Sequence, residues 1–227
     1  MNIRLATYNI KFHRAYPDLP DLVKQSNVDI LCLQECDIKK VDKEVGKLSL
    51  ATTARVGTMG LAIYCDLRRF KILASEQIPL PSVWYEHVNI QPRFRLQTVQ
   101  LEDKKSGTEF VLANLHLANL LAGNYARRRQ AKKVFEYVNE NHESKPAIVV
   151  GDFNYPIFAN KLVKIARANS FQQLGTKNRQ HTHNNPFIRG KFDRIFVSKN
   201  IQEKSFDVLP FGTSDHTPVI IELDIKE

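Results

Sequence analysis

The chain has 227 residues, and its 33 Lys and Arg residues against 24 Asp and Glu residues give a formal net charge of +9. Hydrophobic residues make up 43% of the chain, and Gly and Pro contribute only 9 and 10 positions, which excludes a disordered, collagen-like or low-complexity protein. Because no apolar run approaches the ~18–20 residues of a membrane span and no secretory signal opens the chain, we expect a cytoplasmic protein.

The N-terminal part of the chain predicts three strands and a helix. Residues 3–10 alternate between apolar and polar side chains as a strand does, and residues 29–34 form a short apolar run typical of a buried strand. Between them, residues 18–27 follow a proline and indicate a helix. Residues 61–64 indicate a further strand.

The middle of the chain predicts a hairpin followed by a long helix. Residues 94–101 and 110–117 flank the sequence Lys-Lys-Ser-Gly, so we expect two paired strands joined by a turn. Residues 125–142 show apolar side chains at i, i+3, i+4 and i+7, which make one stripe on a helix. Extending that stripe backwards places Arg127 on the inward face near the start of the helix.

The last third of the chain predicts a strand, a helix and then two more strands. Residues 147–150 read as a fully buried strand, residues 157–168 as a helix, and residues 192–197 and 218–225 as strands. Neither a repeat nor a linker interrupts the alternation of strands and helices. This order points to an α/β protein with two packed sheets and helices outside them.

Basic residues gather in two stretches of the chain. Residues 160–200 hold nine bases and one acid, and residues 121–135 hold five bases and no acid. Such clusters suit a polyanionic partner, although a solvated surface has the same composition. We therefore take Arg127, Arg189 and Lys191 as candidate substrate-binding residues.

The three cysteines, Cys32, Cys36 and Cys65, are too few and too irregularly spaced for a disulfide framework or a zinc site. Free cysteine usually behaves as a small buried hydrophobic residue. We expect a structural role for all three, in a reducing compartment.

Most of the predicted strands end in a polar residue that is costly to bury. These residues are Asn9, Glu35, His116, Asp152, Asn154, Asp193, Asp215 and His216. Buried charges are paired, hydrogen-bonded or bound to metal. This number of polar residues beside apolar strands therefore predicts a shared cleft. Carboxylate and amide oxygens suit a hard cation such as Mg²⁺ or Mn²⁺, and a metal pocket ringed by bases suits phosphate-ester hydrolysis.

The motifs around these residues are similar to those of the endonuclease/exonuclease/phosphatase superfamily, which includes DNase I-like nucleases and exonuclease III-type repair enzymes. Gly-Asp-Phe-Asn at 151–154 followed by Ser-Asp-His-Thr-Pro at 214–218 is the most specific pair. The matching segments extend from residue 7 to residue 218 and also include Thr-Tyr-Asn-Ile, Leu-Gln-Glu, Asn-Leu-His-Leu and Phe-Asp-Arg-Ile-Phe-Val-Ser. The resemblance implies one catalytic domain over residues 1–227, folded as a four-layer α/β sandwich of two packed mixed sheets flanked by helices.

The resemblance also implies the metal ligands. Glu35 resembles the main ligand of a Mg²⁺ ion, or of Mn²⁺ in its place, and Asn9 assists it. Asp215 resembles a further ligand or the carboxylate of a second metal ion. Thr182 and His183 have parallels in the family, but we assign them no role.

The same resemblance assigns catalytic roles to the remaining polar residues. Asp152 resembles the residue that orients or deprotonates the attacking water, and Asn154 the one that contacts phosphate. His216 resembles a histidine that binds phosphate or acts as base, held by Asp193 because a carboxylate fixes the tautomer of an imidazole. Which of Asp152 and His216 takes the proton stays open at this point.

His116 indicates the branch of the superfamily. Exonuclease III-type enzymes usually carry tyrosine in this region, whereas DNase I-like, sphingomyelinase-like and tyrosyl-DNA phosphodiesterase-like members carry histidine. His116 could donate to the phosphate or to the leaving oxygen. Arg127 and Gln130 match a helical Arg-x-x-Gln pattern of the histidine-bearing branches and are expected to support the site or to pack in the core.

Three functions remain open from the sequence. The leading one is a divalent-metal-dependent phosphodiesterase acting on nucleic acid, with DNA as the expected substrate, in which Phe187, Phe192 and Tyr155 could stack on bases. The second acts on a phospholipid headgroup or inositol phosphate, with Val83-Trp84-Tyr85 as the candidate for membrane insertion. The third, an inactive nucleic-acid-binding module, ranks last because every catalytic residue is present.

Overall fold

A seven-stranded sheet carries the N-terminal part of the chain and its last two strands. The computed structural model describes residues 1–84, 93–142, 145–184, 188–210 and 212–226. In sheet order, the seven strands are β14 (Ile201–Val208), β15 (Val219–Ile225), β1 (Asn2–Asn9), β2 (Ile30–Cys36), β5 (Met59–Cys65), β4 (Leu48–Val56) and β3 (Glu44–Val45). β1 and β2 run parallel and the other neighbours antiparallel, so the sheet is mixed.

A six-stranded sheet packs against the first one. Its strands, in order, are β10 (Phe171–Gln173), β13 (Asp193–Ser198), β9 (Ala147–Asp152), β8 (Glu109–His116), β7 (Leu96–Asp103) and β6 (Phe70–Ile78). β8 and β9 form the one parallel pair among them. A separate two-stranded ribbon consists of β11 (His183–Asn184) and β12 (Arg189–Gly190).

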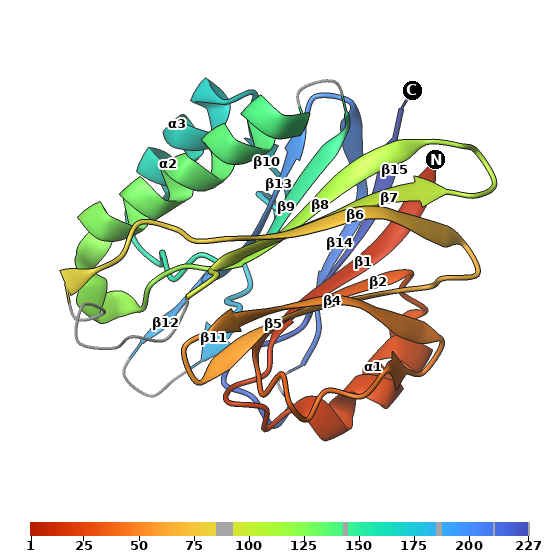
Figure 1. The fold of residues 1–227 in the computed structure, drawn as a ribbon. Helices are drawn as coiled ribbons and strands as arrows, with labels where there is room; N and C mark the ends of the chain where they lie inside the picture. Colours follow the sequence, from red (N-terminus) through yellow and green to blue (C-terminus); the bar gives the residue numbers. More distant parts are fainter. Residues whose placement is uncertain (85–92, 143–144, 185–187, 211, 227) are drawn as a thin grey trace.

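Helices cover the outer face of each sheet and complete four layers, as Figure 1 shows. The helix α1 (Leu19–Ser26) packs on the seven-stranded sheet, while α2 (Gly123–His142) and α3 (Ala159–Ala168) pack on the six-stranded sheet. Two short 3₁₀ turns, η1 (Tyr16–Asp18) and η3 (Leu120–Ala122), precede α1 and α2. The predicted four-layer α/β sandwich with two mixed sheets is confirmed.

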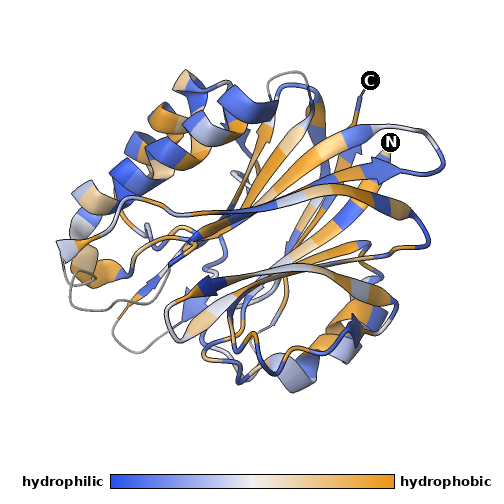
Figure 2. Cartoon of the chain, in the orientation of Figure 1, coloured by the Kyte–Doolittle hydropathy of each residue, from blue (hydrophilic) through white to orange (hydrophobic). Residues whose placement is uncertain are grey.

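Three apolar clusters hold the layers together. One lies between the two sheets and one lies between each sheet and its helices. Figure 2 shows the matching pattern, with hydrophobic residues along the strands and on the inner faces of the helices. The central strands β1, β2, β8 and β9 therefore contribute to two clusters each, because alternate side chains point to opposite faces.

Several strands escape prediction because they lie at sheet edges. β14 is an edge strand whose side chains are mostly polar or charged, and the edge strand β6 has an exposed segment over residues 74–77. Charged side chains on an edge strand discourage pairing with another molecule, and they also remove the apolar alternation that identifies a strand. β4, the neighbour of the short edge strand β3, has only two fully buried positions and is likewise missed.

A buried polar network joins the two sheets beneath their common end. Gln34 on β2 donates to Asn114 Oδ1 on β8 at 2.8 Å and to Thr7 Oγ1 on β1 at 3.0 Å. Asn114 Nδ2 in turn donates to the Leu33 carbonyl at 3.0 Å, and all these side chains are inaccessible to solvent. Because buried polar groups are costly unless satisfied, the network fixes how the two sheets meet.

Replacing Asn114 with Ala is expected to lower the free energy of unfolding by about 2–3 kcal/mol, because Gln34 loses one of its acceptors at a position that solvent does not reach. Urea unfolding would measure the loss. The matched control is Gln202→Ala on the exposed face of β14, which should change the stability by less than about 0.5 kcal/mol. Equal values for the two variants would contradict a structural role for the network.

Candidate active site

The polar residues at the strand ends meet at one edge of the two sheets. Parallel strands end at the same edge, and β1 with β2 therefore bring Asn9 beside the Gln34–Glu35 step. In the other sheet His116 pairs in register with Asp152, and Asp152 pairs with Asp193 on the antiparallel strand β13. A pocket of about 640 Å³ opens here, lined among others by Glu35, His116, Asp152, Asn154, Asp215 and His216.

Glu35 is turned into the pocket by an irregularity in its strand. The register between β2 and β5 shifts between Gln34 and Cys36, and Glu35 has a φ of 58°. Its Oε1 accepts from Asn9 Nδ2 at 3.2 Å, and its Oε2 accepts from the Phe12 amide at 3.0 Å. The carboxylate is thus held by two donors while its side chain stays 19% exposed to the pocket.

The loop after β1 supplies that amide through an unusual backbone. Lys11, Phe12 and His13 have φ values of 45°, 52° and 68°, so three consecutive L-residues lie in the left-handed region. Each such residue costs roughly 1–2 kcal/mol. The hydrogen bonds from Lys11 N to Asn9 Oδ1 (3.0 Å) and from His13 N to the Glu35 carbonyl (2.9 Å) hold the segment against the site.

Asp152 lies at the centre of the contacts in the pocket. Its side chain is 1% exposed, and its Oδ2 accepts from Asn9 Nδ2 at 3.0 Å. The same oxygen lies 3.5 Å from His116 Nε2 and 3.8 Å from His216 Nε2. Burial raises the pKa of the Asp152 carboxyl, and the two histidines offset part of that effect.

The residues on either side of Asp152 explain the Gly-Asp-Phe-Asn motif. Gly151 has a φ of 133°, and a Cβ there would lie 2.1 Å from the Leu115 carbonyl oxygen, so only glycine fits. The Asn154 amide donates to Asp152 Oδ1 at 2.7 Å. Asn154 Nδ2 donates to the Leu117 carbonyl at 3.1 Å and to Asp152 Oδ2 at 3.3 Å, which fixes the carboxylate from a second direction.

His216 and Asp193 form a buried pair, with 2.8 Å between His216 Nδ1 and Asp193 Oδ2. The Thr182 hydroxyl accepts from the backbone amide of Asp193 at 3.0 Å, and the Ser214 hydroxyl accepts from that of His216 at 3.1 Å. Burial opposes charge on His216, but the carboxylates of Asp193 and Asp152 outweigh it and raise its pKa to about 9. His216 is therefore an imidazolium at neutral pH.

His116 differs from His216 in its charge state. Its side chain is 15% exposed, and burial lowers its pKa to about 4, although Asp152 acts in the opposite direction. The backbone around it is held by Arg95, which is 5% exposed and donates from Nη1 to the His116 carbonyl at 3.0 Å. A neutral imidazole thus stands between Glu35 and Asp152, with its Nε2 3.8 Å from Glu35 Oε1.

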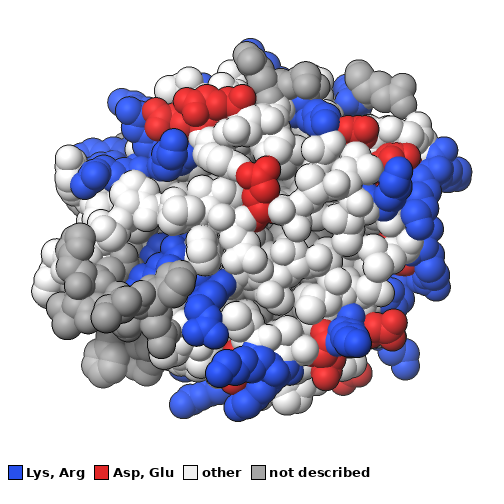
Figure 3. Space-filling model, in the orientation of Figure 1, with Lys and Arg blue, Asp and Glu red and all other residues white. Residues whose placement is uncertain are grey.

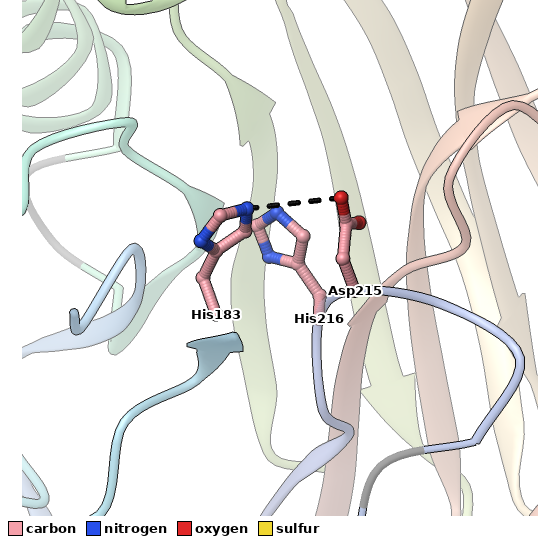
Figure 4. A group of neighbouring side chains, drawn as sticks. All are labelled: His183, Asp215 and His216. Carbon is pink, nitrogen blue, oxygen red and sulfur yellow. Dashed lines mark ion pairs between the residues drawn. The ribbon is translucent and has the colours of Figure 1, made fainter. Parts of the chain in front are cut away.

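Asp215 faces the pocket from the loop before β15 and has two cationic or titratable neighbours. Lys11 Nζ lies 2.9 Å from Asp215 Oδ2, and His183 Nε2 lies 3.8 Å from the same oxygen. Burial alone would raise the pKa of Asp215, but Lys11 and His216 lower it. Figure 4 shows His183, Asp215 and His216 as one group, whose ligand atoms all lie within 4.8 Å of one another.

Two sets of side chains could thus hold a metal ion. The set around Glu35 offers carboxylate oxygens, which fit Mg²⁺ or Mn²⁺. Asn9 turns its Nδ2 to Glu35 and its Oδ1 to the Lys11 amide, so it holds the carboxylate in place. The His183, Asp215 and His216 set contains two imidazoles, but His216 is paired with Asp193 and protonated, and a histidine must be neutral to bind a metal. The donor chemistry therefore favours the oxygens around Glu35.

The structure places the predicted basic residues outside this pocket. Arg127 is 3% exposed on α2 and donates to the Asn119 carbonyl at 2.5 Å and to Asn124 Oδ1 at 2.6 Å. It therefore ties the start of the helix to the preceding turn. Arg189 and Lys191 line a separate hollow.

The aromatic residues that could stack on bases lie in different places. Tyr155 and Phe192 are buried, at 0% and 2% exposure, although the edge of Phe192 reaches the pocket wall. Phe187 lies outside the described residues. An aromatic residue that sequence reasoning missed, Phe12, is 60% exposed at the pocket.

Other pocket residues that the sequence did not reveal are Lys11 and Arg95. Lys11 directly follows the predicted strand 3–10, Arg95 lies near the start of the predicted strand 94–101, and no motif identifies either of them. His183 has a family parallel but received no role, and the pocket contains it beside Asp215. The signal that could have found Lys11 is its position two residues after Asn9, in the same strand-end loop.

The three cysteines, Cys32, Cys36 and Cys65, are buried, as expected for small hydrophobic residues, and they are unpaired. On the face drawn in Figure 3, Lys and Arg lie mainly around the margin beside acidic residues, and most of the centre is uncharged. Within the described part of the chain, no helix is long and apolar enough to cross a membrane.

A comparison of the sequence with known families gives a match over most of the chain. A profile described as the Endonuclease/Exonuclease/phosphatase family matches residues 6–216, which include all eight polar residues of the strand ends. No curated protein sequence matches the chain significantly.

Solved structures resemble this one over their whole length. An endonuclease/exonuclease/phosphatase family protein from Bacteroides thetaiotaomicron is 23% identical, with 98% of this chain and 97% of that chain covered and a TM-score of 0.81. D. rerio TDP2 complexed with a single strand DNA product is 18% identical, with coverages of 98% and 99% and a TM-score of 0.79. A mannosyl-6-phosphatase from Bacteroides thetaiotaomicron is 21% identical, with coverages of 98% and 100% and a TM-score of 0.77. At these identities the likeness shows a shared fold.

Proposed function

Because the chain belongs to the Endonuclease/Exonuclease/phosphatase family, we propose that it is a divalent-metal-dependent phosphodiesterase that acts on nucleic acid, with DNA as the expected polymer. One observation carries the proposal. A buried carboxylate, Asp152, lies within 3.8 Å of an imidazolium and within hydrogen-bond reach of an asparagine that also binds Glu35. This combination supports the assignment of a base, a phosphate-binding cation and a metal ligand to one pocket.

Glu35 is the residue that would hold a Mg²⁺ or Mn²⁺ ion, assisted by Asn9 and with Asp215 as a further carboxylate of the pocket. When bound, the ion would neutralise phosphate oxygens and stabilise the charge that builds up in the transition state. The two hydrogen bonds on the Glu35 carboxylate would orient its remaining lone pairs. The observation in favour of this site is the Glu35 carboxylate, which lines the pocket and offers the oxygen ligands that Mg²⁺ prefers.

Asp152 is the better candidate for the base that activates water. An imidazolium cannot accept a proton, so the raised pKa of His216 leaves His216 to bind and neutralise the phosphate. Burial raises the pKa of the Asp152 carboxyl above its usual value, which makes the carboxylate a stronger proton acceptor. Asp193 then acts by holding His216 in its charged form.

His116 and Asn154 would complete the surroundings of the phosphate. The neutral His116 imidazole has one N–H to donate, and it faces both Glu35 and Asp152 at 3.8 and 3.5 Å. Asn154 acts mainly through Asp152, because its amide nitrogen already donates to the carboxylate and to the Leu117 carbonyl. We therefore expect His116 to contact phosphate or the leaving oxygen.

Nucleic acid is favoured over smaller esters by the charge and by the pocket mouth. The chain carries a net charge of +9, and Phe12 presents a largely exposed ring beside the metal ligand. Base–aromatic stacking contributes ~1–3 kcal/mol and works with any base. One structural neighbour is described in complex with a single strand DNA product.

The first test is a cleavage panel with and without Mg²⁺. Intact, nicked, abasic and single-stranded DNA are compared with RNA, bis(p-nitrophenyl) phosphate and phosphoinositides. Metal-dependent cleavage of at least one nucleic acid is expected. Cleavage of the phosphoinositides alone would overturn the nucleic-acid part of the proposal.

A prediction on binding follows from counterion release. Raising NaCl from about 50 to about 200 mM is expected to weaken the binding of single-stranded DNA about seven-fold if two phosphates are contacted, since each contributes ~0.7 to the salt slope. Fluorescence anisotropy in EDTA would measure the affinity without cleavage. A binding constant that does not change with salt would count decisively against a polyanionic substrate.

The second candidate substrate is a phospholipid headgroup or inositol phosphate. Trp84 favours it, because its side chain is 72% exposed and a surface tryptophan suits a membrane interface. The neighbouring Val83 is buried, and Tyr85 lies outside the described residues. One structural neighbour is described as a mannosyl-6-phosphatase, a name that refers to a small phosphate ester. An inactive binding module is the least favoured function, because every residue that the resemblance assigns to catalysis is present in the sequence.

A further inference from the structure

The ribbon of β11 and β12 separates the candidate active site from a second hollow. Ile188 and Phe192 line the active-site pocket, whereas Arg189 and Lys191 line a hollow of about 510 Å³ on the other side. This alternation follows from extended backbone, in which successive side chains point to opposite faces. One short segment therefore contributes to both surfaces.

The second hollow is lined by cations without matching anions. Four of its residues are basic, namely Arg179, Arg189, Lys191 and Arg194, and His181 adds a titratable group. No Asp or Glu of the described chain lines it. None of the four bases forms an ion pair with an acidic residue among the described segments. Four of the nine bases between residues 160 and 200 are thus gathered here.

Arg194 is the strongest sign that the hollow has a ligand. Its side chain is 5% exposed, and Nη2 donates to the Tyr155 carbonyl at 3.0 Å. Its Nε has no hydrogen-bond partner in the described structure. The adjacent Asp193 is bonded to His216, so it does not neutralise this guanidinium by contact. A buried guanidinium without an anion is costly, and a bound anion would remove that cost.

The hollow is held in a fixed position relative to the active site. The Asn184 amide on β11 donates to the Asp215 carbonyl at 2.8 Å, and the Thr182 amide donates to the Gly190 carbonyl at 3.0 Å. Gly190 packs so closely that a Cβ there would lie 2.9 Å from Pro156 Cβ. A ligand that spans both surfaces would therefore meet two anion sites at a constant separation.

We propose that this hollow binds a second backbone phosphate of the nucleic-acid strand whose scissile phosphate lies in the active-site pocket. The inference rests on the proposed function. It assigns Arg189 and Lys191 to a phosphate beyond the reacting one, and adds Arg179 and Arg194 as its further ligands. A strand with several phosphates suits this arrangement, because one phosphate group cannot occupy the pocket and the second hollow at the same time.

The test uses the double variant Arg179→Gln/Arg189→Gln. Both arginine side chains are exposed, and neither forms a hydrogen bond within the described chain. Its matched control is Lys104→Gln/Lys105→Gln, which removes two charges from the turn at the opposite end of β8. The probe is a fluorescein-labelled single-stranded 12-mer of DNA, titrated in EDTA at several salt concentrations. The kcat/KM values for the 12-mer and for bis(p-nitrophenyl) phosphate are then measured with Mg²⁺.

The double variant is expected to bind the 12-mer about five- to ten-fold more weakly at low salt, with a salt slope smaller by about 0.7, the contribution of the one phosphate that the hollow binds. The ratio of its kcat/KM for the 12-mer to that for the small diester should fall by a similar factor. The control should keep the wild-type slope. Equal binding by the double variant and wild type, or an equal loss in the control, would overturn the inference.

Failure of the proposed function gives a different result. The wild type could hydrolyse the small diester with Mg²⁺ without binding the 12-mer. That result would contradict a nucleic-acid substrate, and the second phosphate site would be refuted together with it. A wild-type enzyme that binds and cleaves the 12-mer, while the double variant does so equally well, disproves the second site alone.

Discussion

Replacing Asp152 with Asn is expected to lower kcat by at least about 10³-fold, which lies within the range for loss of a positioned general base. An amide has nearly the shape of the carboxylate but does not accept a proton at neutral pH. Turnover of bis(p-nitrophenyl) phosphate with saturating Mg²⁺ is the measurement. Asp152→Ala should have at least the same effect, because it also removes the anion 3.8 Å from the charged His216.

The protein should remain folded in the Asp152→Asn variant. The introduced amide would keep an oxygen to accept from the Asn154 backbone amide, which now bonds Asp152 Oδ1 at 2.7 Å. Asp207→Asn on the exposed part of β14 is the matched control, because it exchanges the same groups far from the pocket and should keep wild-type turnover. Circular dichroism and urea unfolding check both variants.

Retained turnover in Asp152→Asn would refute the assignment and make His216 the remaining candidate base. The variant Asp193→Asn then separates the possibilities. If His216 acts as a cation, removing the carboxylate at 2.8 Å lowers activity because the imidazole loses its proton near neutral pH. If His216 is instead the base, the same change lowers its pKa and frees it to accept a proton.

The position of the site is the most predictable part of this protein. Asn9, Asp152 and His116 each end a strand or follow one within a residue, and the parallel pairs β1–β2 and β8–β9 bring such ends to one edge. The order of the strands in each sheet depends on contacts between segments that are far apart in the sequence. No local sequence pattern predicts such contacts. The family resemblance supplied that part of the fold, and the structural neighbours bear it out.

The residues that escaped prediction owe their positions to the backbone of loops. Lys11 and Phe12 reach the pocket through left-handed φ values that favour glycine, at positions where the sequence has none. Nothing in their side chains signals this conformation. Arg127 shows the opposite case, because the helical stripe correctly predicts its inward position, whereas its partners on the preceding turn follow from tertiary structure.

Replacing Glu35 with Gln is expected to raise the Mg²⁺ concentration needed for half-maximal activity by at least about 100-fold, since even residues that only orient a metal ligand commonly contribute 10–100-fold to metal affinity. The glutamine side chain keeps the size of glutamate and an oxygen for the Phe12 amide at 3.0 Å. Chelation with EDTA should abolish wild-type activity, and added Mg²⁺ or Mn²⁺ should restore it.

Binding of the ion can be followed without turnover. A metal ion that binds only the folded protein stabilises it by about 2.7 kcal/mol at one hundred times its dissociation constant, so Mn²⁺ should raise the Tm of the wild type. Glu35→Gln should lose that rise at the same concentration. Electron paramagnetic resonance of Mn²⁺ gives the dissociation constant directly.

The variant His183→Gln decides between the two possible sets of ligands. His183 belongs to the group with Asp215 and His216, but it has no bond to Glu35 or Asn9 among the described contacts. If the oxygens around Glu35 hold the ion, His183→Gln binds Mn²⁺ as the wild type does. A variant pair with the reverse behaviour, in which Glu35→Gln binds normally and His183→Gln does not, would move the metal to the histidine group. His216 would then have to be neutral, and its assignment as the phosphate-binding cation would fail with the metal site.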